Sequence, residues 1–587
     1  MRPDDLALLR TPGAAAVSPD GRIAVVAVTR LDLAADAYRS RLWAVPTDGS
    51  APARPLTAGH RDTAPAFSPD GRWLAYLDAG EDGRPQIAVL PTAGGAARRL
   101  TRHPLGAGRP VWAPDSGRLA YTARVPGAVP RDAGAPRLIT TLPDPFDDGG
   151  SPDDGRSHVF VLHLPDPHGD DDGPPPAPVQ RTDGDADDAD VAWSPDGAEL
   201  AFVRAEDDSA RTVHVVPAGG GGPRRVTTGR RACALPAYAP DGRLLVTVDD
   251  GCPVPCLVGA DGALEPLLDP GPHSRGCPTP APVVVDGAVL VGVRWRGAVQ
   301  LVRVPLDGGA AEPLVEGPFT VSGTGAGGGV VVATVAHDRS AGELVAITPG
   351  RRRLLTGFGR ALGETGRLHP VRERTTTAAG GATVDGWVAL PDGPGPHPVL
   401  LVLHDGPSEP GWRLLDETQV AVSAGYAVVR SSPSSSDAER DADDLLALLD
   451  AALADPALDG ERVGVHGAGH GGWLTARLLT RTTRFTAAVV ERAAPGPEGA
   501  AGAPLDTAPI RTPTLVVHAE ADWSGPPELG PRLHAELRRR GVPAELLLFP
   551  GEGRGLARCG RPRHRLARLE HLLRWWARWL PTGGRAG

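Results

Sequence analysis

The chain has 587 residues, with 61 Lys and Arg against 71 Asp and Glu, so its formal net charge is −10. A single hydrophobic core stops growing at roughly 250–300 residues, so a chain of this length should divide into at least two domains. Net acidity argues against a nucleic-acid partner, because binding to nucleic acid rests largely on Lys and Arg that neutralise phosphates.

The beginning of the chain, MRPDDLALLR, has two aspartates where a secretory signal needs positive charge. The sequence contains no run of about 18 apolar residues, so we expect no membrane span. Five cysteines in so long a chain fit a reducing compartment, and an odd number cannot all form disulfides. These features predict a cytoplasmic protein, and no cluster of residues predicts a cofactor or a metal site.

A short motif recurs through the first 350 residues or so. Ser18-Pro19-Asp20-Gly21 is repeated as Ser68-Pro69-Asp70-Gly71 and Ser194-Pro195-Asp196-Gly197, with variants that begin at Ala113 and Ala239. Each copy lies between alternating apolar runs, which is a strong hairpin signal. A repeat of about 40–50 residues with four strands is typical of a β-propeller blade. Counting two weaker copies, near 285–287 and Gly327, the pattern predicts about seven blades.

One interval between copies is longer than the others. It contains a segment rich in Asp, Gly and Pro, at 125–157. We interpret this acidic insertion as a long loop on one face of the propeller, and the sequence leaves its role open.

From about residue 368 the pattern changes to short apolar strands that alternate with amphipathic helices, which predicts a parallel α/β sheet. The last helix contains Trp575, Trp576 and Trp579, which we expect to pack against the sheet or the propeller. The expected strands are 384–390, 398–404, 426–430, 462–466, 486–490, 514–518 and 545–549, and the expected helices lie near 440–454, 472–480, 527–540 and 563–580.

The strand RVGVH is followed by the elbow sequence Gly467-Ala468-Gly469-His470-Gly471-Gly472. This is the frame of a nucleophile elbow, G-x-S-x-G, in which small residues allow a sharp strand-to-helix turn to present a serine. Gly469 stands where the serine is expected. Glycine has no side chain and cannot attack a carbonyl.

Several segments in fixed order resemble one family. The SPDG repeats are followed by HPVLLVLHDGP, ERVGVHGAGHGGW, TPTLVVHAEADWSGPPEL and LLLFPGEGRGL. Together they resemble the prolyl oligopeptidase family of serine peptidases, in its acylaminoacyl-peptidase and dipeptidyl-peptidase IV-like branch. The resemblance implies an N-terminal β-propeller domain at 1–360, followed by a C-terminal α/β-hydrolase domain at 365–587.

The resemblance also assigns three catalytic positions. Asp522 matches the acid of the family's triad, Gly469 the nucleophilic serine and Arg554 the general-base histidine. A guanidinium stays charged in proteins, so Arg554 cannot replace an imidazole as a base. We expect Arg554 to pair with Asp522 instead.

The oxyanion region also departs from the family's pattern. His404-Asp405-Gly406-Pro407 resembles the family's HGGP segment, but Asp405 replaces a glycine beside Gly406. A carboxylate there would repel a developing oxyanion. The backbone N–H of His470 is the other expected donor, and it needs no particular side chain.

These departures favour a catalytically inactive homologue that keeps a peptide-binding cavity between the two domains. An active peptidase, acyl-peptide hydrolase or esterase with an unconventional nucleophile is an alternative, and the serine-rich loop Ser431–Ser436 is a place to seek one. A protein-interaction scaffold is a third possibility. The expected partner is a peptide or peptide-like ligand, and the resemblance also implies that two chains could form a homodimer.

Overall fold

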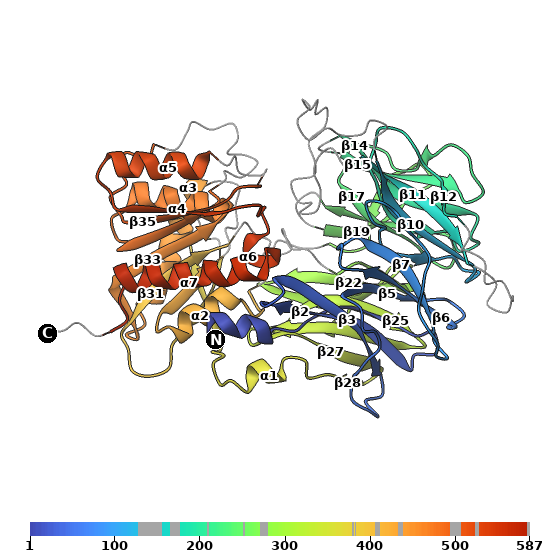
Figure 1. Cartoon of the computed structure of the whole chain (residues 1–587), viewed down its shortest axis with the longest axis horizontal. Helices are drawn as coiled ribbons and strands as arrows, with labels where there is room; N and C mark the ends of the chain where they lie inside the picture. Colours follow the sequence, from blue (N-terminus) through green and yellow to red (C-terminus); the bar gives the residue numbers. More distant parts are fainter. Residues whose placement is uncertain are drawn as a thin grey trace.

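The chain folds into a β-propeller followed by an α/β domain (Figure 1). The computed structural model describes residues 1–126, 155–164, 177–207, 210–249, 253–269, 280–378, 381, 383–404, 411–431, 438–493, 506–522 and 528–583. Within these residues, no helix is long and apolar enough to cross a membrane.

The propeller has seven four-stranded blades within the described residues, as the repeat predicted. Each blade is built from one continuous stretch of chain, and its successive strands pair antiparallel. In chain order the strands are β1 (Thr11–Val17), β2 (Ile23–Asp32), β3 (Ala37–Pro46), β4 (Arg54–Pro55); β5 (Arg61–Phe67), β6 (Trp73–Ala79), β7 (Pro85–Pro91), β8 (Arg98–Arg99); β9 (Val111–Trp112), β10 (Arg118–Val125), β11 (Arg156–His163), β12 (Val179–Gln180); β13 (Asp188–Trp193), β14 (Glu199–Asp207), β15 (Ala210–Pro217), β16 (Arg224–Arg225); β17 (Cys233–Tyr238), β18 (Leu244–Asp249), β19 (Pro253–Val258), β20 (Leu264–Pro266); β21 (Val283–Val285), β22 (Ala288–Trp295), β23 (Ala298–Pro305), β24 (Glu312–Val315); and β25 (Thr320–Gly327), β26 (Val330–His337), β27 (Ser340–Thr348), β28 (Arg351–Leu354).

The SPDG motif forms the turn between the first two strands of a blade. In the first copy the Ser18 hydroxyl donates to Asp20 Oδ1 at 2.6 Å and accepts from the N–H of Ile23 at 3.0 Å. Gly21 takes φ 72°, a left-handed conformation that glycine adopts at little cost. The same Ser–Asp bond occurs at Ser68 and Ser194, also at 2.6 Å. These local bonds fix the turn and explain why the motif recurs.

The acidic insertion falls in the β10–β11 connection. Strands β10 and β11 pair along their whole length, from Val125 opposite Arg156 to Arg118 opposite His163. Most of the predicted loop, at 127–154, lies outside the described residues.

The α/β domain is built on an eight-stranded sheet in the order β29-β30-β32-β31-β33-β34-β35-β36. Strands β31 to β36 run parallel, as predicted, whereas at one edge β30 pairs antiparallel with both of its neighbours, β29 and β32. The strands are β29 (Val371–Thr377), β30 (Thr383–Ala389), β31 (His397–Leu403), β32 (Ala427–Ser431), β33 (Leu458–Ala468), β34 (Ala487–Glu491), β35 (Thr514–Ala519) and β36 (Ala544–Phe549). Within the described residues, the helices are η1 (Pro3–Leu8), α1 (Arg360–Gly363), α2 (Asp416–Ser423), α3 (Ala438–Leu453), α4 (His470–Arg481), α5 (Leu529–Arg539), α6 (Leu556–Cys559) and α7 (Pro562–Trp579).

Helices cover both faces of this sheet. Alternate residues of β31 point to opposite sides, with Leu401 in the cluster that includes α3 and α4, and Leu400 in the cluster that includes α7. Trp575 and Trp576 of α7 are 1% and 2% exposed in the second cluster, so both pack against the sheet, as expected. Burial on both faces explains why the central strands are continuous apolar runs.

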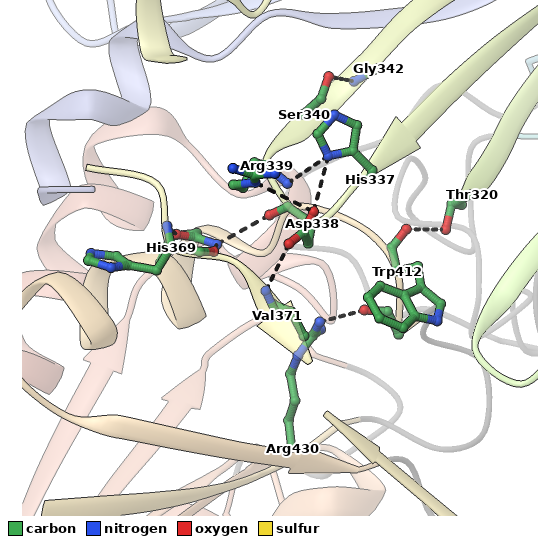
Figure 2. Close-up of polar contacts among 12 residues, drawn as sticks. Thr320, His337, Asp338, Arg339, Ser340, Gly342, His369, Val371, Trp412 and Arg430 are labelled. Atoms are coloured by element: carbon green, nitrogen blue, oxygen red, sulfur yellow. Dashed lines mark hydrogen bonds and ion pairs between the residues drawn. The ribbon is translucent and has the colours of Figure 1, made fainter. Parts of the chain in front are cut away.

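The hairpin between β26 and β27 fastens the propeller to the α/β domain (Figure 2). At its tip, Asp338 Oδ2 accepts from the N–H of Val371 at 2.8 Å. Gln419 of α2 donates through Nε2 to the backbone oxygen of Asp338 at 3.2 Å and accepts from the N–H of His369 at 2.8 Å.

The last propeller strand ends at Leu354 and the sheet of the α/β domain begins at Val371. The division into 1–360 and 365–587 stays a prediction.

A second hairpin, between β22 and β23, also contacts the α/β domain. Its turn residue Gly297 packs so closely on Trp387 that a Cβ there would overlap the indole ring. The backbone oxygen of Gly297 accepts from the N–H of Trp412 at 3.1 Å, and Thr320 Oγ1 donates to the Trp412 oxygen at 2.6 Å (Figure 2).

Candidate active site

The elbow has the sharp strand-to-helix geometry that its sequence predicted. Strand β33 ends at Ala468, Gly469 follows with φ 58° and ψ −121°, and α4 begins at His470. The N–H of Gly469 donates to the backbone oxygen of Glu491 at 2.9 Å, and its own oxygen accepts from Trp473 at 3.1 Å. A residue with a side chain is strained in this conformation, and glycine is not.

The other elbow glycines are required by close packing. A Cβ at Gly467 would overlap the backbone oxygen of Gly471, and a Cβ at Gly472 would overlap that of Glu491. A Cβ at Gly471 would lie 2.5 Å from the backbone oxygen of Leu403. The turn therefore has the small residues that a nucleophile elbow needs, with Gly469 at the position that the resemblance assigns to the nucleophile.

Asp522, which the resemblance assigns as the triad acid, is 2% exposed and follows strand β35. Its Oδ2 accepts from Arg492 NH1 at 3.2 Å. Arg492 is itself 4% exposed and has φ 45°, a left-handed conformation that is uncommon for a residue other than glycine. The backbone turn after β34 thus directs a guanidinium at the acid.

Arg554, which the resemblance places at the general-base position, lies half-buried between β36 and α6. Its loop is joined to the Asp522 loop, because the N–H of Ala521 donates to the backbone oxygen of Glu552 at 2.8 Å. The Glu552 carboxylate is held in turn by His564, with Nδ1 2.5 Å from Oε1. The structure therefore brings the two loops together. The pairing of Arg554 with Asp522 stays a prediction.

An ionic cluster lies beside the elbow, because the backbone oxygen of Glu491 accepts from Gly469. Its members are Glu491, Arg568, Glu417 and His466. Arg568 of α7 donates through NH2 to Glu491 Oε2 at 2.6 Å and to Glu417 Oε2 at 2.9 Å. His466 Nε2 lies 3.5 Å from Glu491 Oε2. Burial disfavours ionisation, but Arg568 outweighs that penalty and holds the pKa values of Glu491 and Glu417 below their usual range. The same carboxylates raise the pKa of Arg568 against the effect of its burial.

His470, whose backbone N–H is the predicted oxyanion donor, begins α4. Its ring stacks on Trp473, with centroids 5.9 Å apart, and Nε2 lies 4.0 Å from Asp441 Oδ2. The other two oxyanion residues, Asp405 and Gly406, lie outside the described residues.

The serine-rich loop is described only at its first residue. Ser431 is 1% exposed, and its hydroxyl donates to the backbone oxygen of Asp385 at 2.8 Å. Residues 432–436 lie outside the described part of the chain. A buried hydroxyl held in this way gives no support to Ser431 as a nucleophile.

Two residues of the site were missed by the sequence analysis, Glu491 and Arg492. The signal for them was a Glu-Arg pair directly after the apolar strand TAAVV. A charge at the carboxyl end of a central parallel strand lies at the edge of the sheet where such proteins place their chemistry.

A seven-bladed propeller joined to an α/β domain with a nucleophile elbow defines a propeller-bearing α/β hydrolase. A model of the prolyl oligopeptidase family matches residues 418–494 and 500–582. An uncharacterized peptidase of Bacillus subtilis, YuxL, is 25% identical over 95% of this chain and 96% of its own length. Dipeptidyl-peptidase 5 of Porphyromonas gingivalis is 22% identical over 96% of this chain and 93% of its own.

Solved structures share the whole fold. The acylaminoacyl peptidase of Pyrococcus horikoshii superimposes with a TM-score of 0.82 at 17% identity, covering 100% of this chain and 98% of that one. A puromycin hydrolase gives a TM-score of 0.70 at 20% identity, covering 98% and 95%. The match to the prolyl oligopeptidase family lies in the α/β domain, and over nearly its whole length the chain is similar to peptidases.

Proposed function

We propose that this chain is a non-hydrolytic member of the family that binds peptides between its two domains without cleaving them. The observation that carries the proposal is Gly469, which occupies the nucleophile position of a complete elbow with φ 58° and ψ −121°. The backbone of the elbow has the expected turn, but Gly469 has no side-chain atom that could attack a carbonyl.

The substitution at the base position supports the same function. Acyl transfer by a serine needs a group that accepts the hydroxyl proton and returns it to the leaving group. Arg554 cannot do so, because its guanidinium stays protonated. Two separate loops therefore lack a group that acyl transfer needs, the nucleophile in one and the general base in the other. Asp522 stays buried beside Arg492.

Peptides are the proposed ligand because of the relatives. An acylaminoacyl peptidase that superimposes on this chain with a TM-score of 0.82 has been solved in complex with Z-Gly-Gly-Phe-chloromethyl ketone, a peptide derivative. The present chain covers nearly the full length of that protein and of the curated peptidase YuxL. Binding needs neither a nucleophile nor a base, so it can outlast their loss.

The test combines binding with turnover. Purified protein is titrated with a fluorescent, amino-blocked Gly-Gly-Phe amide, and chromogenic aminoacyl and acyl-aminoacyl substrates are assayed in parallel. The proposal predicts saturable binding and no released chromophore. Turnover that is lost in Asp522→Asn would favour the active peptidase instead. Absence of both binding and turnover would favour the interaction scaffold.

A further inference from the structure

The propeller has a cavity of about 960 Å³, and the residues that line it are distant in the sequence from the elbow. Its walls are strands β2 and β3, the segment 52–60, Arg10, and the segment from Leu354, the last residue of β28, to Arg360. In Figure 1, strand β28 lies at the lower edge of the propeller, below the label of β3. This volume is within the range of ligand sites, which is roughly 300–1,000 Å³.

The charge of the cavity is opposite to that of the whole chain. Its lining contains Arg10, Arg30, Arg39, Arg41 and Arg360 but one carboxylate, Asp32. The chain as a whole has a net charge of −10. A local excess of arginine in an acidic protein attracts anions.

The pleat of the sheet places these arginines on one face. Arg39 and Arg41 are two residues apart on β3, so both point to the same side as Trp43, and Arg30 of β2 lies directly opposite Arg39. Like charges opposite one another destabilise a sheet. Asp32 lies 3.3 Å from Arg30, between NH2 and Oδ2. The positive charges of the other lining arginines repel one another, which lowers the stability of the folded protein. A bound anion would reduce this repulsion.

Two of the arginines are available to a ligand. Within the described residues, the side chains of Arg41 and Arg360 form no hydrogen bond or ion pair, and both are exposed. Arg10 is half-buried, and burial, followed by the nearby charge of Arg30, lowers its pKa. An anion beside Arg10 would favour its charged form.

An apolar patch completes the lining. Trp43 and Phe358 pack edge to face with centroids 5.5 Å apart, and Leu354 is 65% exposed. An exposed leucine beside two half-buried aromatic rings offers contacts for apolar side chains of a ligand.

We infer that this cavity binds an extended acidic peptide, with carboxylates at alternate positions on the arginines and apolar side chains on Trp43, Phe358 and Leu354. Alternate side chains of an extended strand are roughly 6.5–7 Å apart, which is also the spacing of Arg39 and Arg41 along β3. Adjacent phosphates of a nucleotide are bonded through one oxygen and carry their charge in a much smaller space. The row of arginines therefore fits distributed carboxylates better than a polyphosphate.

The test measures binding by fluorescence anisotropy at low ionic strength. The probe is a fluorescein-labelled Glu-Leu-Glu-Leu-Glu-Leu peptide, with Gln-Leu-Gln-Leu-Gln-Leu as the uncharged peptide control. We expect the acidic peptide to bind, the glutamine peptide to bind at least about tenfold more weakly, and about 0.5 M salt to weaken the acidic complex.

The variant Arg39→Gln/Arg41→Gln should weaken binding of the acidic peptide by roughly tenfold or more. The matched control is Arg98→Gln/Arg102→Gln, two exposed arginines outside the cavity, which should change binding less than about twofold. Thermal unfolding checks that both variants fold. Equal losses in the two double variants, or no binding by wild type, would overturn the inference. So would tripolyphosphate that displaces the peptide at lower concentration than unlabelled peptide does.

Discussion

Arg492 and Asp522 are joined by an ion pair in which both side chains are almost fully buried, with NH1 3.2 Å from Oδ2. The pair connects the residue directly after strand β34 to the residue that the resemblance assigns as the triad acid. Glu491, directly before Arg492, accepts from the N–H of Gly469 through its backbone oxygen. Two adjacent residues, Glu491 and Arg492, therefore contact Gly469 and Asp522 respectively.

Arg492→Gln should lower the free energy of unfolding by about 3–5 kcal/mol, because it removes one partner of a buried ion pair. Urea denaturation measures the change. The control is Arg484→Gln, which breaks an exposed pair with Asp450 and should cost less than about 1 kcal/mol. A similar loss of unfolding free energy in both variants would mean that the buried pair stabilises the protein no more than the exposed pair does.

Gly469→Ser should fold and cost about 1–3 kcal/mol, because a side chain at this φ and ψ strains the backbone. Gly467→Ala should cost more, since its Cβ would overlap the backbone oxygen of Gly471. Thermal unfolding of the two variants ranks them. The reverse order would show that the elbow is not packed as described.

Stability should fall in acid because of the cluster around Glu491. Its pKa in the folded protein lies below the ordinary value of 4.5, so the unfolded chain binds a proton at a higher pH than the folded one. The stabilisation is complete above about pH 4.5 and is lost as the pH falls further.

Glu491→Gln removes this titration. The variant should unfold at lower temperature than wild type at pH 7, and the difference should shrink between about pH 5 and pH 3. Thermal unfolding followed across that range measures both effects. A difference that stays constant with pH would contradict the assigned role of Glu491.

The docking of the two domains depends on a glycine. Gly297→Ala would place a Cβ on Trp387, whereas Gly287→Ala, in another hairpin turn of the same blade, has open space around it. Both residues have positive φ, 74° and 64°, so both variants share the backbone strain. We expect Gly297→Ala to be less stable than Gly287→Ala by roughly 1–3 kcal/mol. Equal stability in calorimetry would show that the β22–β23 hairpin does not need its close contact with Trp387.

Much of the fold could be predicted because its signals are local. Ser18 and Asp20 hydrogen-bond within their own turn, and residues such as Leu400 and Leu401 belong to a continuous apolar strand. Edge strand β29 was missed because its residues, VRERTTT, are mostly exposed and polar. Strand β29 is defined by its backbone pairing with β30, which the pattern of its side chains does not reveal.

The site was predicted less completely, for a physical reason. Gly469, Asp522 and Arg554 stand at motif positions, which sequence order reveals. The contact of Arg492 with Asp522 depends on φ 45° at Arg492 and on two loops that are 30 residues apart. Likewise, Arg568 reaches Glu491 from a helix 77 residues later. Such partners are set by the packing of the sheet and α7.

The most direct test of the account is fluorophosphonate labelling of wild type and of Gly469→Ser/Arg554→His, with turnover of acyl-aminoacyl substrates measured on the same samples. The same double variant carrying Asp522→Asn is the control. Wild type is expected to be neither labelled nor active, the double variant to be labelled and to gain turnover, and Asp522→Asn to remove most of this gain. Wild-type turnover that survives Asp522→Asn would contradict it, because the chemistry would then lie elsewhere in the chain.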